Sequence, residues 1–351
     1  MPKNKVRIGF VGVGSMGQCA HLKNYVTIPD CQVVAIAELR RDTAKKVAAR
    51  YAIPRIYTDH REMLSREQLD GIVASQPFNR HGILIPALMK AGVPVFVEKP
   101  LAGSVPVGGK IAEAVKAGGT FLMVGYHKRS DPATMYAKEA IDRLKLSGEL
   151  GKLKYIRILM PAGDYIANGF VDLVKGNDAQ PNLKTDPLPP DMSEKTYREY
   201  LSFVNYYIHQ VNLMRHLLGE PYSVRYADQS GVLLVGESTS GIPCLIEMSP
   251  YETTIDWQET ALVCFEHGWI KLSLPAPLAI NRAGRVEVFK DPGKSATPQI
   301  IVPQLPWISA MRQQAINFIR AIKREIPPMT TAEEALLDLQ VAKDYLSLRQ
   351  L

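Results

Sequence analysis

Cysteine is scarce in this sequence, and the few cysteines are scattered. Four occur in 351 residues, and none forms a C-x-x-C pair or lies at a zinc-ligand spacing from a histidine. This pattern argues against a disulfide framework and against a structural zinc site, and we expect no bound metal. The thiols are predicted to be reduced and mostly buried. They are Cys19, Cys31, Cys244 and Cys264.

Long apolar runs and concentrated charge are also missing. No apolar run reaches the ~18 residues that a membrane-spanning helix needs, and residues 1–7 lack the apolar centre of a secretory signal. We therefore expect a cytoplasmic protein without a membrane partner. The formal net charge is +7, but basic and acidic residues are interleaved. Nucleic-acid binding requires a basic face rather than a basic total, so we expect no nucleic acid and favour an anionic small molecule.

The order of apolar patterns predicts two domains. Residues 5–125 alternate between short β-branched runs and helical segments, which is typical of a parallel, doubly wound sheet. After residue 126, several long strands follow one another without a helix between them, which predicts a mainly antiparallel sheet. We therefore predict an α/β protein with an N-terminal Rossmann domain (1–125) and a C-terminal α+β domain for substrate binding and oligomerisation (126–351). The C-terminal helices belong to the second domain or pack back on the first.

Four local predictions bear on the site. A helix is expected over 15–28, another over 42–51 with Asp42 as its N-cap, and a single helix over 193–218. Residues 163–192 are rich in Gly, Asn, Asp and Pro, which predicts a long surface excursion. Such loops are usually functional or mobile, and residues 164–177 are candidates for shaping specificity.

A glycine-rich turn follows the first strand. Residues 12–17 read G-x-G-x-x-G between a strand and a helix. Gly12 is expected to make the tight turn, Gly14 to let the backbone approach a pyrophosphate, and Gly17 to let helix and strand pack closely. The helix N-terminus at Ser15 and Met16 offers free N–H groups to the phosphates of a dinucleotide. The alternative is a glycine-rich turn without a ligand.

An acidic residue follows the second strand at the spacing that this motif requires. Glu38 lies 21 residues after Gly17, where an acid hydrogen-bonds the adenosine ribose hydroxyls. A carboxylate would repel a 2′-phosphate, so we predict NAD rather than NADP. Arg40 and Arg41 are the counter-indication, because a nearby arginine can accept that phosphate.

A lysine ends the fifth strand, in the sequence Glu98-Lys99-Pro100. Ligands in open α/β sheets bind outside the carboxyl ends of the strands, so Lys99 is expected to point into the cofactor cleft. Proline biases the residue before it toward extended geometry, which would fix the direction of the lysine. The alternative is a surface lysine at a strand end.

Taken together, these motifs resemble the glucose–fructose oxidoreductase / inositol dehydrogenase / rhizopine-catabolism (Gfo/Idh/MocA) family. The resemblance covers essentially the whole chain, and the E-K-P tripeptide is its most specific element. It rests on residues 12–17, on Gln76-Pro77-Phe78-Asn79-Arg80-His81, on residues 98–100, on Gly125-Tyr126-His127-Lys128-Arg129, on His209-Gln210-Val211-Asn212 and on residues 217–221.

The family resemblance implies a hydride transferred between a secondary alcohol carbon and the nicotinamide. It implies that Lys99 hydrogen-bonds the reacting hydroxyl and helps to move its proton, and that His209 assists. Asn205 stands where the family usually has an aspartate. Asparagine can accept an imidazole N–H but adds no charge, so Lys99 or a tyrosine (Tyr126, Tyr206 or Tyr207) would carry more of the proton transfer.

The remaining candidates are assigned by resemblance and position. At spacings of i, i+4 and i+7, Asn205, His209 and Asn212 are expected to share one helical face; the alternative for Asn212 is a structural role on that face. Asn79 and His81 lie near the nicotinamide ribose or mark a helix start, and Lys128, Arg129 and Asp131 reach a ligand or form a solvated loop. The predicted cofactor contacts are Gly12, Gly14, Ser15, Met16, Gly17, Glu38, Arg40, Gln76, Pro77, Asn79, His81, Glu98, Lys99 and Lys128; the predicted substrate contacts are Lys99, Tyr126, Asn205 and His209.

The function predicted from the sequence is reversible, NAD-dependent oxidation of one ring hydroxyl of a sugar, glycoside or cyclitol, with C3 oxidation of a glycoside as one form. Three alternatives stay open: an NAD-dependent glycosidase that oxidises the sugar transiently, a sugar–sugar oxidoreductase with permanently bound NAD, and a non-enzymatic NAD-sensing regulator. An apolar face on the antiparallel sheet and the resemblance both favour a homodimer or homotetramer.

Overall fold

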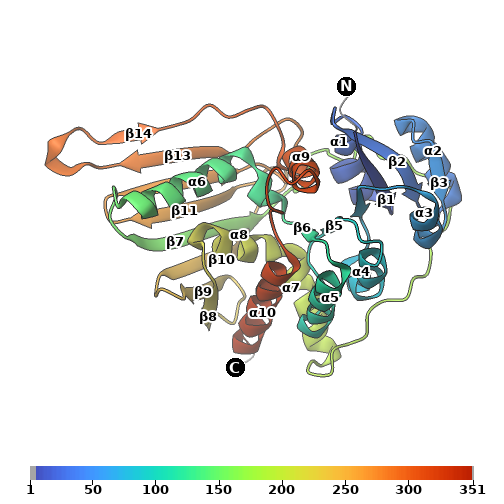
Figure 1. The fold of residues 1–351 in the computed structure, drawn as a ribbon. Helices are drawn as coiled ribbons and strands as arrows, with labels where there is room; N and C mark the ends of the chain where they lie inside the picture. Colours follow the sequence, from blue (N-terminus) through green and yellow to red (C-terminus); the bar gives the residue numbers. More distant parts are fainter. Residues whose placement is uncertain (1–4, 350–351) are drawn as a thin grey trace. The chain divides into compact units, whose positions relative to one another are not determined.

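Six parallel strands near the N-terminus form the first sheet (Figure 1). Its order is β3-β2-β1-β4-β5-β6, so the order in which strands are added reverses between β1 and β4, as in dinucleotide-binding sheets. The predicted parallel, doubly wound sheet is confirmed in this computed structural model, which describes residues 5–349. The strands are β1 (Val6–Val11), β2 (Cys31–Ala37), β3 (Arg55–Tyr57), β4 (Gly71–Ala74), β5 (Val95–Glu98) and β6 (Leu122–Gly125).

Aromatic side chains fill the core behind this sheet. Phe318 from the C-terminal helix α9 lies 5.7 Å from Phe96 and 6.4 Å from Tyr25, measured between ring centroids. The Tyr25 and Phe10 rings are nearly perpendicular, with 5.4 Å between their centroids. The packed rings make α9 part of the core of the parallel sheet. The helices around the sheet are η1 (Gly17–Leu22), α1 (Lys23–Tyr25), α2 (Arg41–Tyr51), α3 (His60–Arg66), η2 (Phe78–Arg80), α4 (His81–Met89), α5 (Val105–Gly118), α9 (Ala310–Ile322) and the first part, to residue 339, of α10 (Ala332–Arg349).

The chain divides into two compact units, and it passes between them more than once. Unit 1 comprises residues 5–126, 168–197 and 311–339. Unit 2 comprises residues 127–167, 198–310 and 340–349. The long irregular excursion therefore belongs to unit 1, together with the parallel sheet.

Unit 2 is built on a second, eight-stranded sheet of order β14-β13-β12-β11-β7-β10-β9-β8. β7 and β10 pair in parallel and the other neighbouring strands pair antiparallel, which confirms the mainly antiparallel prediction. Buried and half-exposed residues alternate along β9 and β11, so one face carries most of the buried side chains. The strands are β7 (Leu153–Ala162), β8 (Tyr222–Ala227), β9 (Leu233–Ser238), β10 (Pro243–Glu252), β11 (Glu259–Phe265), β12 (Gly268–Leu274), β13 (Arg285–Lys290) and β14 (Gln299–Ile301).

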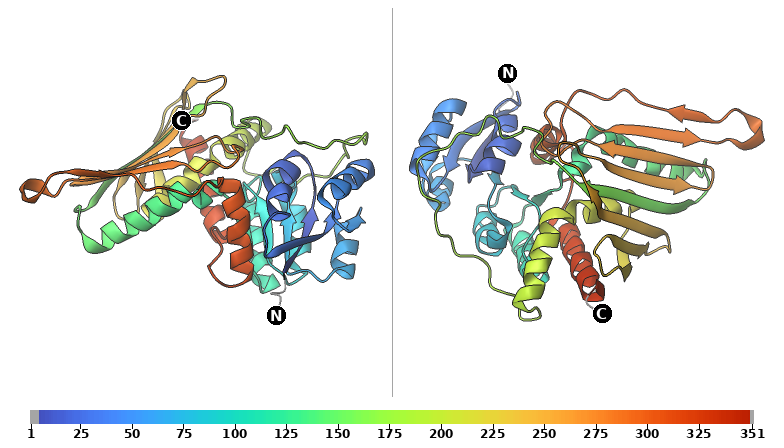
Figure 2. Two further views of the ribbon diagram at one scale, coloured as in Figure 1. Left: turned by 90° about the horizontal axis from the view of Figure 1, so that it is seen from above. Right: turned by 180° about the vertical axis from the view of Figure 1, so that it is seen from behind.

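Helices pack along this sheet, with α6 lying against β12 and β13 and α8 against β7 and β10 (Figure 2). None of the helices within residues 5–349 is both long enough and apolar enough to cross a membrane. Cys19, Cys31 and Cys244 are buried and Cys264 is half-buried, all as free thiols. The helices of this part are η3 (His127–Ser130), α6 (Pro132–Ser147), α7 (Glu194–Tyr206), α8 (Ile208–Leu218) and η4 (Gly293–Ser295).

Two predicted helices differ from those observed. The helix expected over 193–218 is two helices, because Tyr207 interrupts it: the Gln210 N–H bonds to the Tyr207 carbonyl in a tighter, three-residue turn. The helix expected over 15–28 ends at Tyr25, and its middle, η1, is π-helical. The interruption at Tyr207 assigns Asn205 and His209 to different helices, but Tyr207 itself keeps right-handed helical dihedrals, so their common face stays a prediction.

Candidate functional site

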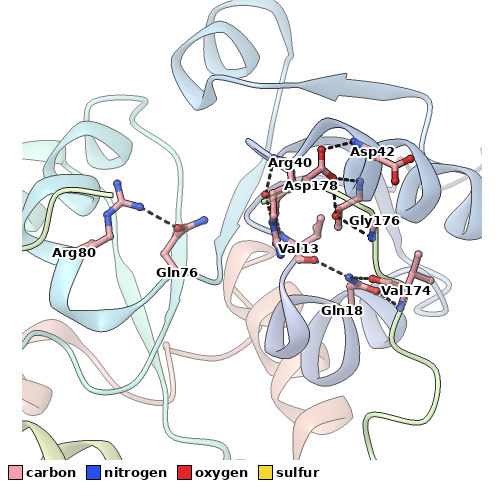
Figure 3. Close-up of polar contacts among 11 residues, drawn as sticks. Val13, Gln18, Arg40, Asp42, Gln76, Arg80, Val174, Gly176 and Asp178 are labelled. Atoms are coloured by element: carbon pink, nitrogen blue, oxygen red, sulfur yellow. Dashed lines mark hydrogen bonds and ion pairs between the residues drawn. The ribbon is translucent and has the colours of Figure 1, made fainter. Parts of the chain in front are cut away.

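A cleft in unit 1 lies beyond the carboxyl ends of β1, β2 and β4, and it has a volume of about 730 Å³. We call it the unit-1 cleft. One side is closed by the Gly-rich turn and another by η2, where the Arg80 guanidinium donates to the Gln76 side chain at 3.4 Å (Figure 3). The predicted cofactor residues that line it are Gly12, Gly14, Ser15, Glu38, Arg40, Gln76, Pro77 and Asn79.

The turn has the backbone geometry that makes glycine necessary. Gly12 has a φ of +89°, and a Cβ there would lie 2.2 Å from Gln76 Nε2. A Cβ at Gly17 would lie 2.7 Å from the Gly12 carbonyl oxygen, so helix and strand approach closely there. A Cβ at Gly14 would meet only the Arg40 guanidinium, at 3.7 Å. The first and third glycines are therefore needed by the fold, whereas the second leaves the backbone open to the cleft.

The Glu38 carboxylate forms the polar corner of the unit-1 cleft. It accepts hydrogen bonds from the Val13 N–H at 2.9 Å, the Arg40 N–H at 3.1 Å and Arg40 Nε at 2.9 Å. Burial raises the pKa of Glu38, but these bonds outweigh burial and lower it overall. The hydrogen bonds that the Arg40 guanidinium donates to Glu38 raise the pKa of Arg40. The Arg40 guanidinium is thus held by the Glu38 carboxylate at this corner of the unit-1 cleft.

We expect Glu38→Ala to shift cofactor preference toward NADP. The substitution removes the acceptor for the ribose hydroxyls and releases the Arg40 guanidinium. Because a hydrogen bond to a charged group contributes about 1.5–3 kcal/mol, the ratio of NADP⁺ to NAD⁺ affinity should rise by about 10–100-fold. Calorimetric titration with each cofactor measures this ratio without a substrate. Glu113→Ala, which removes an exposed acid on α5 of the same unit, is the matched control; equal ratios in both variants would contradict the role of Glu38.

At the end of β5, Glu98 holds the backbone of Lys99. The Lys99 N–H donates to Glu98 Oε2 at 3.1 Å, and His21 Nε2 lies 2.5 Å from Glu98 Oε1. Burial raises the pKa of Glu98, but His21 and the Lys99 charge outweigh it and lower the pKa. His21 comes from η1, so this contact links the strand end to the helix after the Gly-rich turn. No local pattern points to His21, because His21 and Glu98 are 77 positions apart.

Other predicted residues of unit 1 lie outside the residues that line the cleft. Lys99 and Met16 are half-buried, Tyr126 is buried, and Gly17 and Glu98 are buried behind the turn and the strand end. His81 is fully buried, and its Nδ1 lies 3.1 Å from the Leu101 carbonyl oxygen. Burial lowers the pKa of His81. As the first residue of α4 it fits the helix-start alternative.

In unit 2, the half-buried His209 lies beside a second histidine. The rings of His127 and His209 meet edge to face with 4.5 Å between centroids. Asn205 is exposed on the last turn of α7, whereas His209 is on α8. Asn212 is buried and accepts a hydrogen bond from Arg129 Nε at 2.8 Å. His127 therefore joins His209 in a cluster that the motif reading did not single out.

Lys128 forms a buried ion pair with Glu259, which is not among the predicted site residues. Gln210 Nε2 donates to Glu259 Oε1 at 2.8 Å, and Trp257 Nε1 donates to Glu259 Oε2 at 3.1 Å. Lys128, Arg129 and Asp131 are all buried, so the solvated-loop alternative is wrong for them. The Lys128 ammonium is thus committed to a carboxylate within its own unit, and its predicted contact with a cofactor stays a prediction.

Asp131 is the N-cap of α6. Its carboxylate accepts hydrogen bonds from the Ala133 N–H at 2.8 Å and the Gly284 N–H at 3.0 Å. Burial raises the pKa of Asp131 to about 6. These contacts give Asp131 a structural role between α6 and the turn before β13.

Comparison with known proteins identifies similar sequences and folds. Residues 6–126 match the family model GFO_IDH_MocA, described as an oxidoreductase family with an NAD-binding Rossmann fold. Myo-inositol 2-dehydrogenase of Thermotoga maritima is 26% identical over 232 residues, 66% of this chain and 60% of the relative. The scyllo-inositol 2-dehydrogenase (NAD⁺) of Bacillus subtilis is 33% identical over 156 residues, 44% of each chain. This chain therefore spans less than two thirds of the length of either relative.

The fold similarity extends further along the chain than the sequence similarity. The crystal structure of myo-inositol 2-dehydrogenase from Lactobacillus plantarum has a TM-score of 0.71 and is 19% identical. The match covers 99% of this chain and 98% of that one. At this identity the likeness concerns the fold, and it includes both sheets.

Proposed function

Because this chain belongs to the Gfo/Idh/MocA oxidoreductase family, whose NAD-binding Rossmann fold covers residues 6–126, we propose that it transfers a hydride between a ring secondary alcohol and NAD. The observation that carries the proposal is the unit-1 cleft, in which the Gly12 turn and the Glu38 carboxylate lie together. The turn suits a pyrophosphate and the carboxylate suits the hydroxyls of an unphosphorylated ribose.

The proposed substrate class is a cyclitol, sugar or glycoside. Both curated relatives described above are inositol dehydrogenases, and they support the cyclitol first. Substrate hydroxyls of this kind need hydrogen-bonding groups rather than an apolar pocket. Such groups are present within unit 2, in the cluster around His209 and His127.

Lys99 is the proposed proton-handling residue. Bound NAD supplies the hydride acceptor at its nicotinamide ring. The Lys99 side chain follows the carboxyl end of β5, and its backbone is fixed by Glu98. In its neutral form the amine would accept the hydroxyl proton as the C–H hydride leaves, so that alcohol becomes ketone and the proton is retained by the protein. His209 is the second proposed group, on the basis of its position in the family motif.

The direct test is a substrate panel of inositols, sugars and glycosides, with NADH formation followed by its absorbance. Purified protein is assayed in parallel for cofactor that it already carries. We expect turnover of one of these classes with NAD⁺. Cleavage of a glycosidic bond without net NADH formation would show that the protein is a glycosidase and not a dehydrogenase. NAD⁺ binding with no turnover of any class would contradict the enzymatic proposal.

Asn205→Asp tests whether residue 205 acts on His209. A carboxylate would favour the protonated imidazole, so the acid limb of the pH–rate profile should move up by about one pH unit. Asn205→Ser, which adds no charge, is the control and should leave the limb in place. Identical profiles for the two variants would show that residue 205 does not act on the titrating group.

A further inference from the structure

A segment of unit 1 without helix or strand passes along one side of that unit (Figure 2). Residues 174–186 of this segment form what we call the strap. It belongs to the excursion expected over 163–192, for which the sequence predicted a surface position and offered no partner. In the structure the strap is held to unit 1 by hydrogen bonds at both of its ends.

The first anchor of the strap is the N-terminus of α2. The Asp178 carboxylate accepts hydrogen bonds from the Asp42 N–H at 3.1 Å and the Thr43 N–H at 2.8 Å (Figure 3). The α2 N-cap residue is Arg40, whose side chain makes no capping bond. The expectation that Asp42 caps this helix is therefore wrong: Asp178 does so from a distant part of the chain. A Cβ at Gly176 would lie 2.4 Å from the Thr43 nitrogen, so the strap lies directly on the helix end.

A buried glutamine ties the same end of the strap to the Gly-rich turn. The Gln18 side chain accepts from the Val174 N–H and donates to the Val174 carbonyl, both at 3.0 Å. Its amide also donates to the Val13 carbonyl oxygen at 2.8 Å (Figure 3). One buried amide thus satisfies the backbone of the strap and the backbone of the turn together.

The second anchor lies at the start of α4. Asp186 is buried, and its carboxylate accepts a hydrogen bond from the Gly82 N–H at 3.0 Å. Its own N–H donates to the Asn79 carbonyl oxygen at 2.7 Å. The Arg80 Nε donates to the Lys184 carbonyl oxygen at 2.9 Å. This anchor is on the β4 side of the unit-1 cleft, whereas Asp178 is on the β2 side.

Between the two anchors the strap lines the unit-1 cleft. Its cleft-lining residues are Gln180, Pro181, Leu183 and Thr185, which share the cleft with Glu38 and with Thr58, Asp59, His60 and Arg61. Glu38 marks the end of the cleft where an adenosine ribose would lie. The strap therefore crosses the end of the unit-1 cleft where an adenosine would lie, from the β2 side to the β4 side.

We propose that the strap is a wall of the dinucleotide site that closes over the adenosine half and retains the cofactor between turnovers. This inference rests on the proposed function. A dinucleotide enclosed by the strap leaves only when an anchor opens, so its release is limited by a loop motion rather than by its own contacts. Among the alternatives for the reaction, retention favours a cycle in which the same NAD is reduced by one substrate and reoxidised by another.

The test compares NADH release from wild-type protein with release from Asp178→Ala/Asp186→Ala. Bound NADH is displaced by excess NAD⁺ in a stopped-flow instrument, and the loss of its enhanced fluorescence gives the dissociation rate. We expect the double variant to release NADH at least about tenfold faster, because charge-assisted anchors are lost at both ends. Asp172→Ala is the matched control: it removes an exposed carboxylate that pairs with Arg50 just before the strap, and surface pairs contribute little.

Equal release rates in wild type and double variant would overturn the strap proposal. A wild-type protein that binds no NAD⁺ in calorimetry would overturn the proposed function instead, so the two failures are distinguishable. If the double variant does not fold, tryptic cleavage of the wild-type protein tests whether the strap encloses the cofactor. Lys175 and Lys184 are exposed on the strap, and saturating NAD⁺ should slow cleavage after both; unchanged cleavage would overturn the proposal.

Discussion

Lys99→Met should lower kcat by about 10²–10⁴-fold, the range that general acid–base catalysis contributes. Methionine keeps much of the length of the side chain but cannot accept or donate the hydroxyl proton. The backbone at residue 99 should stay in place, because Glu98 holds the Lys99 N–H and is itself held by His21. We therefore expect NAD⁺ affinity by calorimetry to be nearly unchanged while steady-state turnover falls.

A second lysine separates this effect from a general loss of positive charge. Lys90 is exposed at the end of α4, and Lys90→Met should retain wild-type turnover. His209→Ala is the informative partner. If Lys99 and His209 act on the same proton, the double variant should lose less than the product of the two single losses. Near-full activity of the Lys99→Met variant would show that Lys99 does not take part in the proton transfer.

Glu259→Ala should destabilise the folded protein by about 3–5 kcal/mol, because it leaves the buried Lys128 ammonium without its carboxylate. The Lys128 and Glu259 side chains are 4% and 0% exposed, so water can replace little of the lost interaction. The donors of Gln210 and Trp257 lose their acceptor as well. Urea denaturation followed by circular dichroism measures the change in the midpoint of unfolding.

Two comparisons show whether burial causes this loss. Arg225 and Glu237 form an exposed pair on neighbouring strands, and Glu237→Ala should cost less than about 1 kcal/mol. In unit 2, Lys128→Met/Glu259→Leu replaces the charges by apolar groups and should recover much of the stability lost in Glu259→Ala. A double variant as unstable as the single one would show that the charge pair is not the cause.

Local patterns were enough to predict much of the fold. The parallel sheet follows from β-branched runs alternating with helical segments, and Gly12 and Gly17 are placed as the G-x-G-x-x-G spacing requires. Glu38 lines the same cleft as the Gly-rich turn, as its spacing from the G-x-G-x-x-G motif predicts. These features depend on residues near one another in sequence, and periodicity and spacing are signals of that kind.

Long-range partners could not be predicted in this way. Asp178 caps a helix 135 residues away, and Glu259 pairs with Lys128 across 131 residues. Nothing in the sequence near either acid distinguishes it from a surface carboxylate. The interruption at Tyr207 was missed for a related reason. Its surroundings have helical periodicity, and the Tyr207 hydroxyl lies 2.5 Å from Ser249 of β10, a contact set by tertiary packing.

The position of α9 has a consequence for the order of events during synthesis. Phe318 belongs to the same core as Phe10 and Phe96, but it leaves the ribosome some two hundred residues after the six strands. Until then the nascent parallel sheet lacks one side of its hydrophobic interior, and the intervening polypeptide must be translated first. Folding of this half therefore cannot finish in simple N-to-C order, and a nascent chain released before α9 would expose aromatic rings to chaperones and proteases.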